Sequence, residues 1–361
     1  MDPLTHVLSG ALLARATARS QRQSQQLVLP LRLRVAAGFA AAAFPDLDLA
    51  LRLIDTLIYL NWHQGPTHSL AMLPAWALLL AHLFSRLTQG RYAWRMFFIP
   101  ICLGIGIHIV GDLINSYGLM LLAPFSTQRF SLPLAFVIDL WFTAIVVAGL
   151  MASLIFPQQK ITAICALIGL TGYVVFLWSL HERALNMGIN HAMTQGMIHA
   201  EVNVLPQPLS PFNWKIIIRS GDVYQIAHVN LWYLEGNQQF DTNAWLLRKM
   251  AAAYQPAMQV SWQNLNQFGD HTSEAAFARE AWHQPAFTQF RQFASFPLLD
   301  RIDQTENGLC AWFLDLRFKF PELPPSFRYG ICRKGNESEW RMHRQQDVFF
   351  LPRNLKVSLC L

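Results

Sequence analysis

Charge is what this sequence lacks most. Only 14% of its 361 residues are charged, whereas 53% are hydrophobic, and an average soluble domain has about 25% charged residues. The shortage is confined to one half. Residues 1–180 contain 11 basic and 6 acidic residues, and residues 181–361 contain 17 and 16. The composition therefore predicts a membrane-embedded N-terminal domain, residues 1–182, and a soluble C-terminal domain, residues 183–361.

Cysteine is also scarce. The five cysteines form no CxxC pair, which argues against a zinc knuckle, and their odd number argues against a fold built on disulfides. Cys310, Cys332 and Cys360 could supply one disulfide if their compartment is oxidising.

A basic run interleaved with aromatic residues is missing from the C-terminal half. The net charge of +6 lies almost wholly in short arginine-bearing loops of the N-terminal half. Such loops orient helices in a bilayer. We therefore expect a lipid bilayer as a partner and no nucleic acid, and we make no prediction about protein partners.

Long apolar runs dominate the N-terminal half. A helix that crosses a bilayer needs about 20 mostly apolar residues. Four runs clearly meet this length. A fifth run, Val35–Ile54, is long enough but contains Asp46, Asp48 and Arg52, and a shorter helix is expected at Leu4–Ala18. We predict an α-helical membrane bundle of about five transmembrane helices with a C-terminal α+β domain. The four clear runs are Leu70–Leu87, Met96–Ile114, Leu134–Phe156 and Ile161–Leu180.

The loops rich in arginine predict the orientation. If Val35–Ile54 spans the membrane, the connections that contain Arg19, Arg91 and Lys160 all fall on one side, which should be cytoplasmic. The C-terminal domain then lies outside the cytoplasm. The chain is predicted to be a multi-pass protein of the cell inner membrane with a periplasmic or otherwise extracytoplasmic C-terminal domain.

The C-terminal half has the patterns of mixed secondary structure. Trp312–Phe320 alternates apolar and charged residues, which is typical of a half-buried strand. Val223–Tyr233 and Leu355–Leu361 are further strand candidates, and Ser273–Phe293 is expected to be an amphipathic helix.

Histidine and aspartate gather where a membrane protein should avoid them. A charged side chain at membrane depth is unfavourable by about 2.5–3.5 kcal/mol on insertion scales, so it needs a partner or a function. His108 and Asp112 are four residues apart in an apolar run, which places both on one face of a helix. An imidazole nitrogen and a carboxylate oxygen presented together form half of a zinc site. The alternative for this pair alone is a hydrogen bond between helices.

Three more elements strengthen the metal interpretation. Asp46 and Asp48 are too close to ionise together near a bilayer without a cation, although they could cap a helix end. His63 and His68 flank a Gly-Pro turn that can fold two rings toward one point, although a single loop histidine is usually solvated. His6 lies in the opening helix. His82, in a leucine-rich run without a nearby carboxylate, is expected to have no such role.

The order of these motifs resembles a known family, the LexA-regulated, membrane-bound metal-dependent hydrolases. The resemblance covers about residues 1–135, including Pro124-Phe125-Ser126 and Arg129-Phe130, and continues more weakly to Pro211-Phe212-Asn213-Trp214. One departure is Gln64, because the family usually has arginine there, which could clamp a phosphate. The motifs are Thr5-His6-x3-Gly10, Phe44-Pro45-Asp46-x-Asp48, His63-x-Gly65-x-Thr67-His68-Ser69 and His108-x3-Asp112-x5-Gly118.

The resemblance implies a helical metal site that is distantly similar to zinc-dependent phospholipases C and single-strand nucleases. It implies a divalent metal, zinc or alternatively manganese, and more than one ion is compatible with so many ligands. The implied metal ligands are His6, Asp46, His63, His68, His108 and Asp112.

We therefore expect a membrane-bound metal-dependent hydrolase that acts on a lipid or other phosphoester substrate at the membrane surface. The metal would lower the pKa of a bound water from 15.7 to about 7. Asp48 is the expected general base, and Asp46 could exchange roles with it. Two alternatives are a non-catalytic metal-binding scaffold or sensor, which would have a closed site, and a transporter, whose charged residues would line a path.

Overall fold

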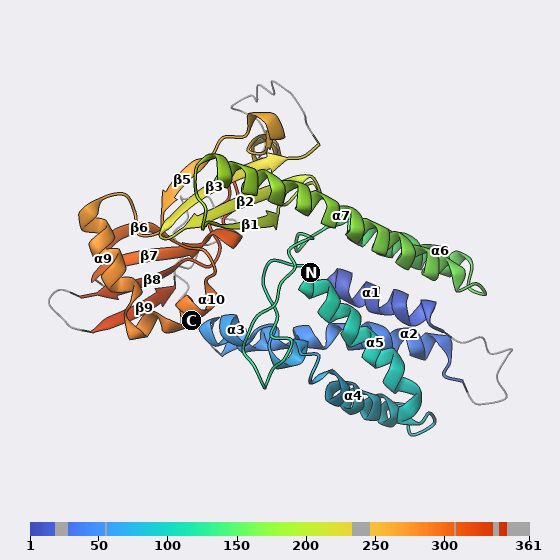
Figure 1. Ribbon diagram of the computed structural model, residues 1–361. Coiled ribbons are helices and arrows are strands. Elements are labelled where there is room, and N and C mark those ends of the chain that lie inside the picture. The colour runs from blue at the N-terminus through green and yellow to red at the C-terminus, as the bar shows by residue number, and fades with distance from the viewer. Residues whose placement is uncertain (19–27, 55, 233–245, 307, 335–338, 345–361) are drawn as a thin grey trace. The chain divides into compact units, whose positions relative to one another are not determined.

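The computed structural model describes residues 1–18, 28–54, 56–232, 246–306, 308–334 and 339–344 (Figure 1). Contacts divide the chain into two compact units. The first comprises residues 1–218, 226–239 and 254–262, and the second comprises residues 219–225, 240–253 and 263–361.

The first unit contains the helices that carry the candidate site. Helix α1 lies against α2, α5 and α6, α2 and α4 both lie against α5, and α6 pairs with α7. The predicted opening helix is confirmed as α1, and the predicted domain division at residue 182 falls inside α7. The helices are α1 (Pro3–Ala16), α2 (Leu31–Ala43), α3 (Thr56–Trp62), α4 (Leu73–Leu87), α5 (Trp94–Leu113), α6 (Leu140–Ile155) and α7 (Ile161–Thr194).

Glycines allow α1, α2 and α5 to approach closely. A Cβ atom built on Gly10 would lie 2.4 Å from the carbonyl oxygen of Gly38, and one built on Gly104 would lie 2.6 Å from that same oxygen. Helices in membranes associate mainly through such small residues, because lipid offers no hydrophobic driving force for helix association. The absence of side chains at Gly10, Gly38 and Gly104 therefore sets the spacing of the three helices.

The prediction of five membrane spans is not supported. Among the described residues, two helices are long and apolar enough to cross a membrane, α5 and α7, and a third span results if the segments Ile58–His68 and Leu73–Leu87, bent by 77°, count as one. The run Val35–Ile54 is not one helix, because α2 ends at Ala43 and a 3-10 helix, Pro45–Leu53, follows. Helix α6 has 16 residues, fewer than the roughly 20 that a span needs.

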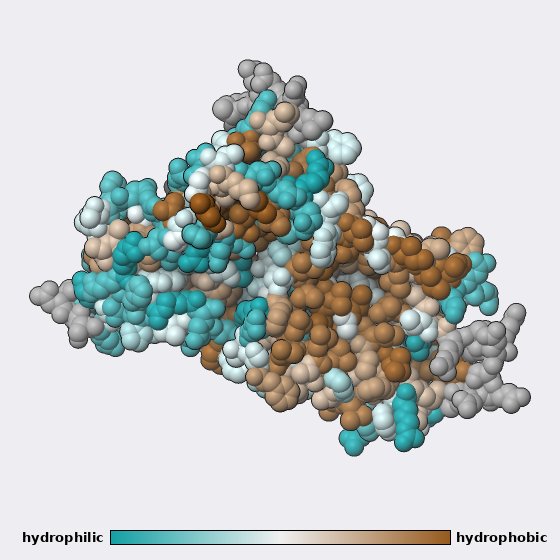
Figure 2. All heavy atoms as spheres, in the orientation of Figure 1, coloured by the Kyte–Doolittle hydropathy of each residue, from teal (hydrophilic) through white to brown (hydrophobic). Residues whose placement is uncertain are grey.

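The outer face of the helices is apolar. Exposed side chains on α4 include Leu79 and Leu83, and those on α7 include Ile168 and Val175. Figure 2 shows hydrophobic residues over most of the visible face of α1, α2, α4 and α5, whereas hydrophilic residues prevail over β6–β9. A surface of this kind is favourable only in contact with lipid or protein.

The strands confirm the predicted α+β character of the C-terminal part. One sheet has the order β1-β2-β3-β4, with β5 also paired to β3, and the other has the antiparallel order β6-β7-β8-β9. The first sheet contains β1 (Glu201–Pro206), β2 (Asn213–Ser220), β3 (Val223–Asn230), β4 (Gln255–Pro256) and β5 (Gln263–Asn266). The second contains β6 (Pro297–Thr305), β7 (Gly308–Asp315), β8 (Tyr329–Arg333) and β9 (Trp340–Arg344), and the helices are α8 (Leu246–Ala252), α9 (Thr272–Trp282) and α10 (Thr288–Phe293).

One predicted strand ends earlier than its pattern indicated, and one predicted helix is interrupted. The predicted strand Trp312–Phe320 ends at Asp315, whose side chain accepts a hydrogen bond from the backbone N–H of Arg317 and begins a short 3-10 helix. The predicted helix Ser273–Phe293 is interrupted at Pro285, which separates α9 from α10. The predicted strand Leu355–Leu361 and Arg19 lie outside the described residues.

Candidate metal centre

Four side chains converge at the C-terminal end of α5. Asp46, His68, His108 and Asp112 each offer one ligand atom, and these four atoms lie within 4.8 Å of one another. Ligand atoms held at about 2.0–2.2 Å by a single ion can be at most about 4.4 Å apart. The observed cluster is thus only slightly wider than an occupied coordination sphere.

The i, i+4 spacing on α5 brings the first pair together as the sequence predicted. The Nε2 atom of His108 lies 3.3 Å from Oδ2 of Asp112. His68 ends a 3-10 helix, Pro66–His68, and its Nε2 atom lies 3.0 Å from Nε2 of His108 and 3.3 Å from Oδ2 of Asp112. Asp46 stands at the start of the 3-10 helix that follows α2, with Oδ1 3.7–3.8 Å from both Nε2 atoms.

Hydrogen bonds on the far side of each ring set the tautomers. The Nδ1 atom of His108 lies 2.7 Å from the carbonyl oxygen of Ala42, which can only accept, so Nδ1 carries the hydrogen. The Nδ1 atom of His68 lies 3.0 Å from Oγ1 of Thr67, whose hydroxyl donates to Asp48. Nε2 is therefore the atom of each ring that faces the carboxylate oxygens, and it is the atom that each imidazole would offer to a metal.

Asp48 faces the outer side of this cluster. Its Oδ1 atom lies 2.8 Å from Nδ1 of His63, and its Oδ2 atom accepts from the backbone N–H of Gln64 and the hydroxyl of Thr67, at 3.1 Å each. Burial alone would raise the pKa of this carboxyl group, but the contacts with His63 and His68 outweigh it and hold the pKa well below its usual range. Asp48 is therefore an ionised carboxylate whose oxygens already have partners.

His6 and His63 lie beside the four converging residues. The Nε2 atom of His6 lies 2.9 Å from Oδ1 of Asp112, and the His6 ring stacks on that of His108 with centroids 3.7 Å apart. The His63 ring meets that of His68 edge-on at 5.7 Å. The structure thus places all six predicted ligands and Asp48 in one continuous network. His82 lies apart on α4, where its ring stacks on Trp94.

Three residues of the network were not singled out from the sequence as site residues. Gln64 and Asn115 each donate a side-chain N–H to Asp112, at 3.0 and 3.2 Å. Arg129 donates to the carbonyl oxygens of Leu60, Asn61, His63 and Gly118 and so holds the chain around His63. No ligand-type spacing marks these residues, and the motif resemblance pointed only toward position 64 and Arg129.

The donor set suits a divalent transition metal. Two imidazoles and two carboxylates are common ligands of zinc, and the same set suits manganese. The side chains of His68 and His108 are 0% exposed and that of Asp112 is 1% exposed, whereas Asp46 is 15% exposed. Burying two carboxylates together is unfavourable without compensating positive charge, and the N-terminal amine of Met1, which pairs with Oδ1 of Asp112, supplies one such charge. Oδ2 of Asp112 and Oδ1 of Asp46 are the oxygens that face the two histidines. The residues therefore fit a bound cation, which Asp46 connects to the outside.

Comparison with known proteins places the helical part in a family of membrane proteins. The sequence model of the family described as YdjM inner membrane protein matches residues 1–184. A curated relative, the "Uncharacterized protein YfhP" of Bacillus subtilis (strain 168), is 24% identical over 239 residues, which are 63% of this chain and 68% of that protein. No solved structure matches. The expected membrane family is confirmed, and the similarity to phospholipases C stays a prediction. With a match over half of its length, this chain belongs to the YdjM inner membrane protein family.

Proposed function

We propose that this protein is a metal-dependent hydrolase of the inner membrane. The observation that carries the proposal is the buried convergence of Asp46, His68, His108 and Asp112, with the Nε2 atoms of both histidines facing Oδ2 of Asp112. A divalent ion, zinc or manganese, would act there as a Lewis acid and would lower the pKa of a bound water toward neutrality.

The contacts suggest different roles for the two aspartates of the Pro45-Asp46-Leu47-Asp48 segment. Oδ1 of Asp46 faces the histidines, and its Oδ2 is buried without a hydrogen-bond partner. That oxygen can accept a proton from an attacking water. Asp48 has its oxygens occupied, so we favour Asp46 as general base and Asp48 as the group that orients His63 and His68. Sequence reasoning favoured Asp48 as base and left the exchange open.

A lipid or other phosphoester at the membrane surface is the substrate class we propose. The helices that carry the site present apolar side chains on their outer face, so an ester headgroup of the bilayer can approach without leaving the membrane. Asp46, the most exposed of the four converging residues, marks the side from which a substrate would reach the centre.

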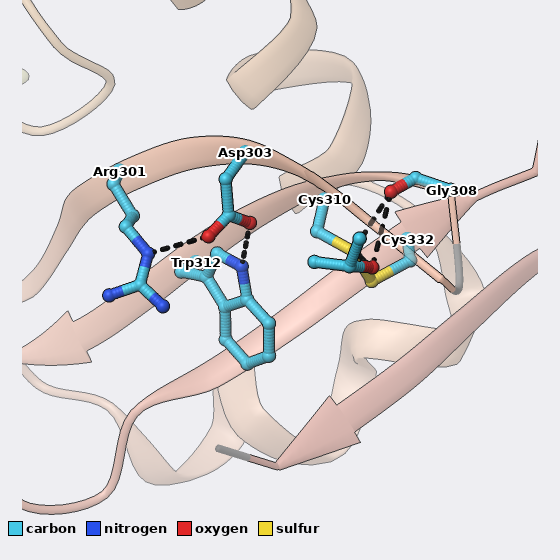
Figure 3. The surroundings of a disulfide bond; sticks show 7 residues. Arg301, Asp303, Gly308, Cys310, Trp312 and Cys332 are labelled. Carbon is cyan, nitrogen blue, oxygen red and sulfur yellow. Dashed lines mark hydrogen bonds and ion pairs between the residues drawn. A yellow bond between two sulfur atoms is a disulfide. The ribbon is translucent and has the colours of Figure 1, made fainter. Parts of the chain in front are cut away.

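For the second unit we propose a location outside the cytoplasm, in a multi-pass protein. Cys310 on β7 and Cys332 on β8 are directly opposed in the sheet and form a disulfide (Figure 3). Disulfides persist in oxidising compartments such as the periplasm and are rare in the cytoplasm. This observation does not depend on the arginine-bearing loops, whose orientation argument required Val35–Ile54 to cross the membrane.

Hydrolysis assays on the full chain in lipid nanodiscs test the proposal. Stripped protein would be reloaded with zinc or manganese and given panels of phospholipids and soluble phosphoesters. We expect turnover by the loaded parent and by His82→Ala, the matched control, and none by His108→Ala. Metal bound by the parent without turnover on any panel would instead favour a non-catalytic scaffold or sensor. For that alternative the complete burial of His68 and His108 is the favourable observation.

A further inference from the structure

Two buried carboxamides flank Asp112, and each has one oxygen without a partner. Gln64 is 5% exposed and Asn115 is 1% exposed. Their nitrogen atoms donate to Oδ2 and Oδ1 of Asp112 respectively. A carboxylate only accepts hydrogen bonds, so the nitrogen of each amide must face it and the oxygen must face away. Among the described residues, Oε1 of Gln64 and Oδ1 of Asn115 are buried without a hydrogen-bond partner.

These oxygens lie close to the converging ligands. The bonds of an amide, 1.23 Å for C=O and 1.33 Å for C–N, keep its oxygen within about 2.6 Å of its nitrogen. Oε1 of Gln64 is therefore within about 6 Å of Oδ2 of Asp112, and that atom lies 3.3 Å from both histidine Nε2 atoms. By the same measure Oδ1 of Asn115 is within about 6 Å of Oδ1 of Asp112, so both unpartnered oxygens lie near the carboxylate of the centre.

The backbone at Gln64 is held in an unusual conformation. Its φ angle is +59°, in the left-handed region that a residue with a long side chain rarely adopts. The conformation is fixed by the N–H of Gln64, which donates to Asp48, and by its carbonyl oxygen, which accepts from the N–H of Met120. Backbone strain of this kind clusters at functional sites, because it persists only where the surroundings enforce it.

We propose that Oε1 of Gln64 and Oδ1 of Asn115 accept hydrogen bonds from O–H groups of the ligand at this centre. A buried acceptor left unsatisfied is unfavourable, so the pair favours a ligand that brings a donor. The site thus selects an oxyanion that carries a hydroxyl, such as a protonated phosphate group, over an oxyanion of the same shape without one. The inference rests on the proposed function, since the metal would bind the anion whose O–H groups donate to the two amides.

Phosphate and sulfate are the matched probes. The two anions have similar size and shape, but near neutral pH phosphate carries a hydroxyl and sulfate does not. Calorimetric titrations of each anion into the zinc-loaded full chain in nanodiscs would be made for the parent and for Gln64→Met and Asn115→Leu, which remove the acceptors at similar volume. Gln128→Met, at an exposed position, is the control.

We expect the parent and Gln128→Met to bind phosphate more tightly than sulfate. Each site variant should lose about tenfold in phosphate affinity, the value of one hydrogen bond to a charged group, while sulfate affinity stays nearly constant. Two variants are used because one of them could fail to fold. Equal losses for both anions, as expected if the amides hold only a water molecule, would overturn the inference, and so would unchanged phosphate affinity. Failure of the parent to bind zinc would instead refute the proposed function, and the inference with it.

Discussion

A substitution that touches no ligand should still weaken metal binding at the centre. Gly104 lies one helical turn before His108 on α5, and a Cβ atom there would stand 2.6 Å from the carbonyl oxygen of Gly38 and 2.8 Å from Cβ of Ala41. Gly104→Ala must therefore push α2 away from α5. The carbonyl oxygen of Ala42, which accepts from His108 at 2.7 Å, moves with α2.

The size of the effect has two parts. Overpacking a tight contact destabilises a protein by about 1–3 kcal/mol. Loss of the carbonyl that orients a metal-binding histidine lowers metal affinity by about 10–100-fold. We expect Gly104→Ala to show both a lower unfolding temperature and a zinc affinity reduced by that factor.

The control lies on the same helix. Within 4 Å of a Cβ atom built on Gly106 lies only Cδ1 of Leu73, at 3.9 Å, which is an ordinary van der Waals contact. Gly106→Ala should therefore leave zinc affinity unchanged. The assay is competition for zinc with a fluorescent chelator, beside a thermal unfolding curve for each variant. Equal zinc affinities for Gly104→Ala and Gly106→Ala would refute the claim that helix spacing positions His108.

Three further predictions concern other parts of the chain. Asp48→Asn should keep some metal but bind it about 10–100-fold more weakly, as measured by the same competition assay, because the amide orients His63 and His68 less well; unchanged affinity would contradict the positioning role. Reduction of Cys310–Cys332, which closes a loop with a sequence separation of 22, should destabilise the second unit by about 3 kcal/mol in denaturant unfolding; an unchanged midpoint would count against it. A cysteine placed at Arg91 should resist impermeant thiol reagents in intact cells, and labelling from outside would reverse the proposed topology.

The sequence was informative about the centre because its chemistry is local. His108 and Asp112 meet through helical periodicity alone, and the turn between His63 and His68 needs no long-range contact to direct two rings. The convergence of these elements was predicted by their order in the motif series, not by physics. The bond from His108 to the carbonyl of Ala42 could not be foreseen, because every residue has a carbonyl and no side-chain pattern marks this one.

The span count was less predictable for a physical reason. The apolar run Val35–Ile54 reads as one helix by hydropathy, but Pro45 follows the last turn of α2, and the chain continues as a 3-10 helix that directs Asp46 and Asp48 toward the histidines. Hydrogen bonds of Asp48 with His63, Gln64 and Thr67 favoured this path over the apolar length of the run. The same competition ended the strand at Asp315, where a side-chain acceptor favours a turn over continued pairing.

The most direct test of the metal centre is the amount of zinc or manganese that the purified full chain binds. Protein in nanodiscs would be stripped with chelator, incubated with each metal, passed over a desalting column and measured by elemental analysis. We expect at least one ion per chain for the parent and for His82→Ala, and a loss of that ion for His108→Ala and Asp112→Ala. Equal metal content in the parent and His108→Ala, or no metal in the parent, would contradict this expectation.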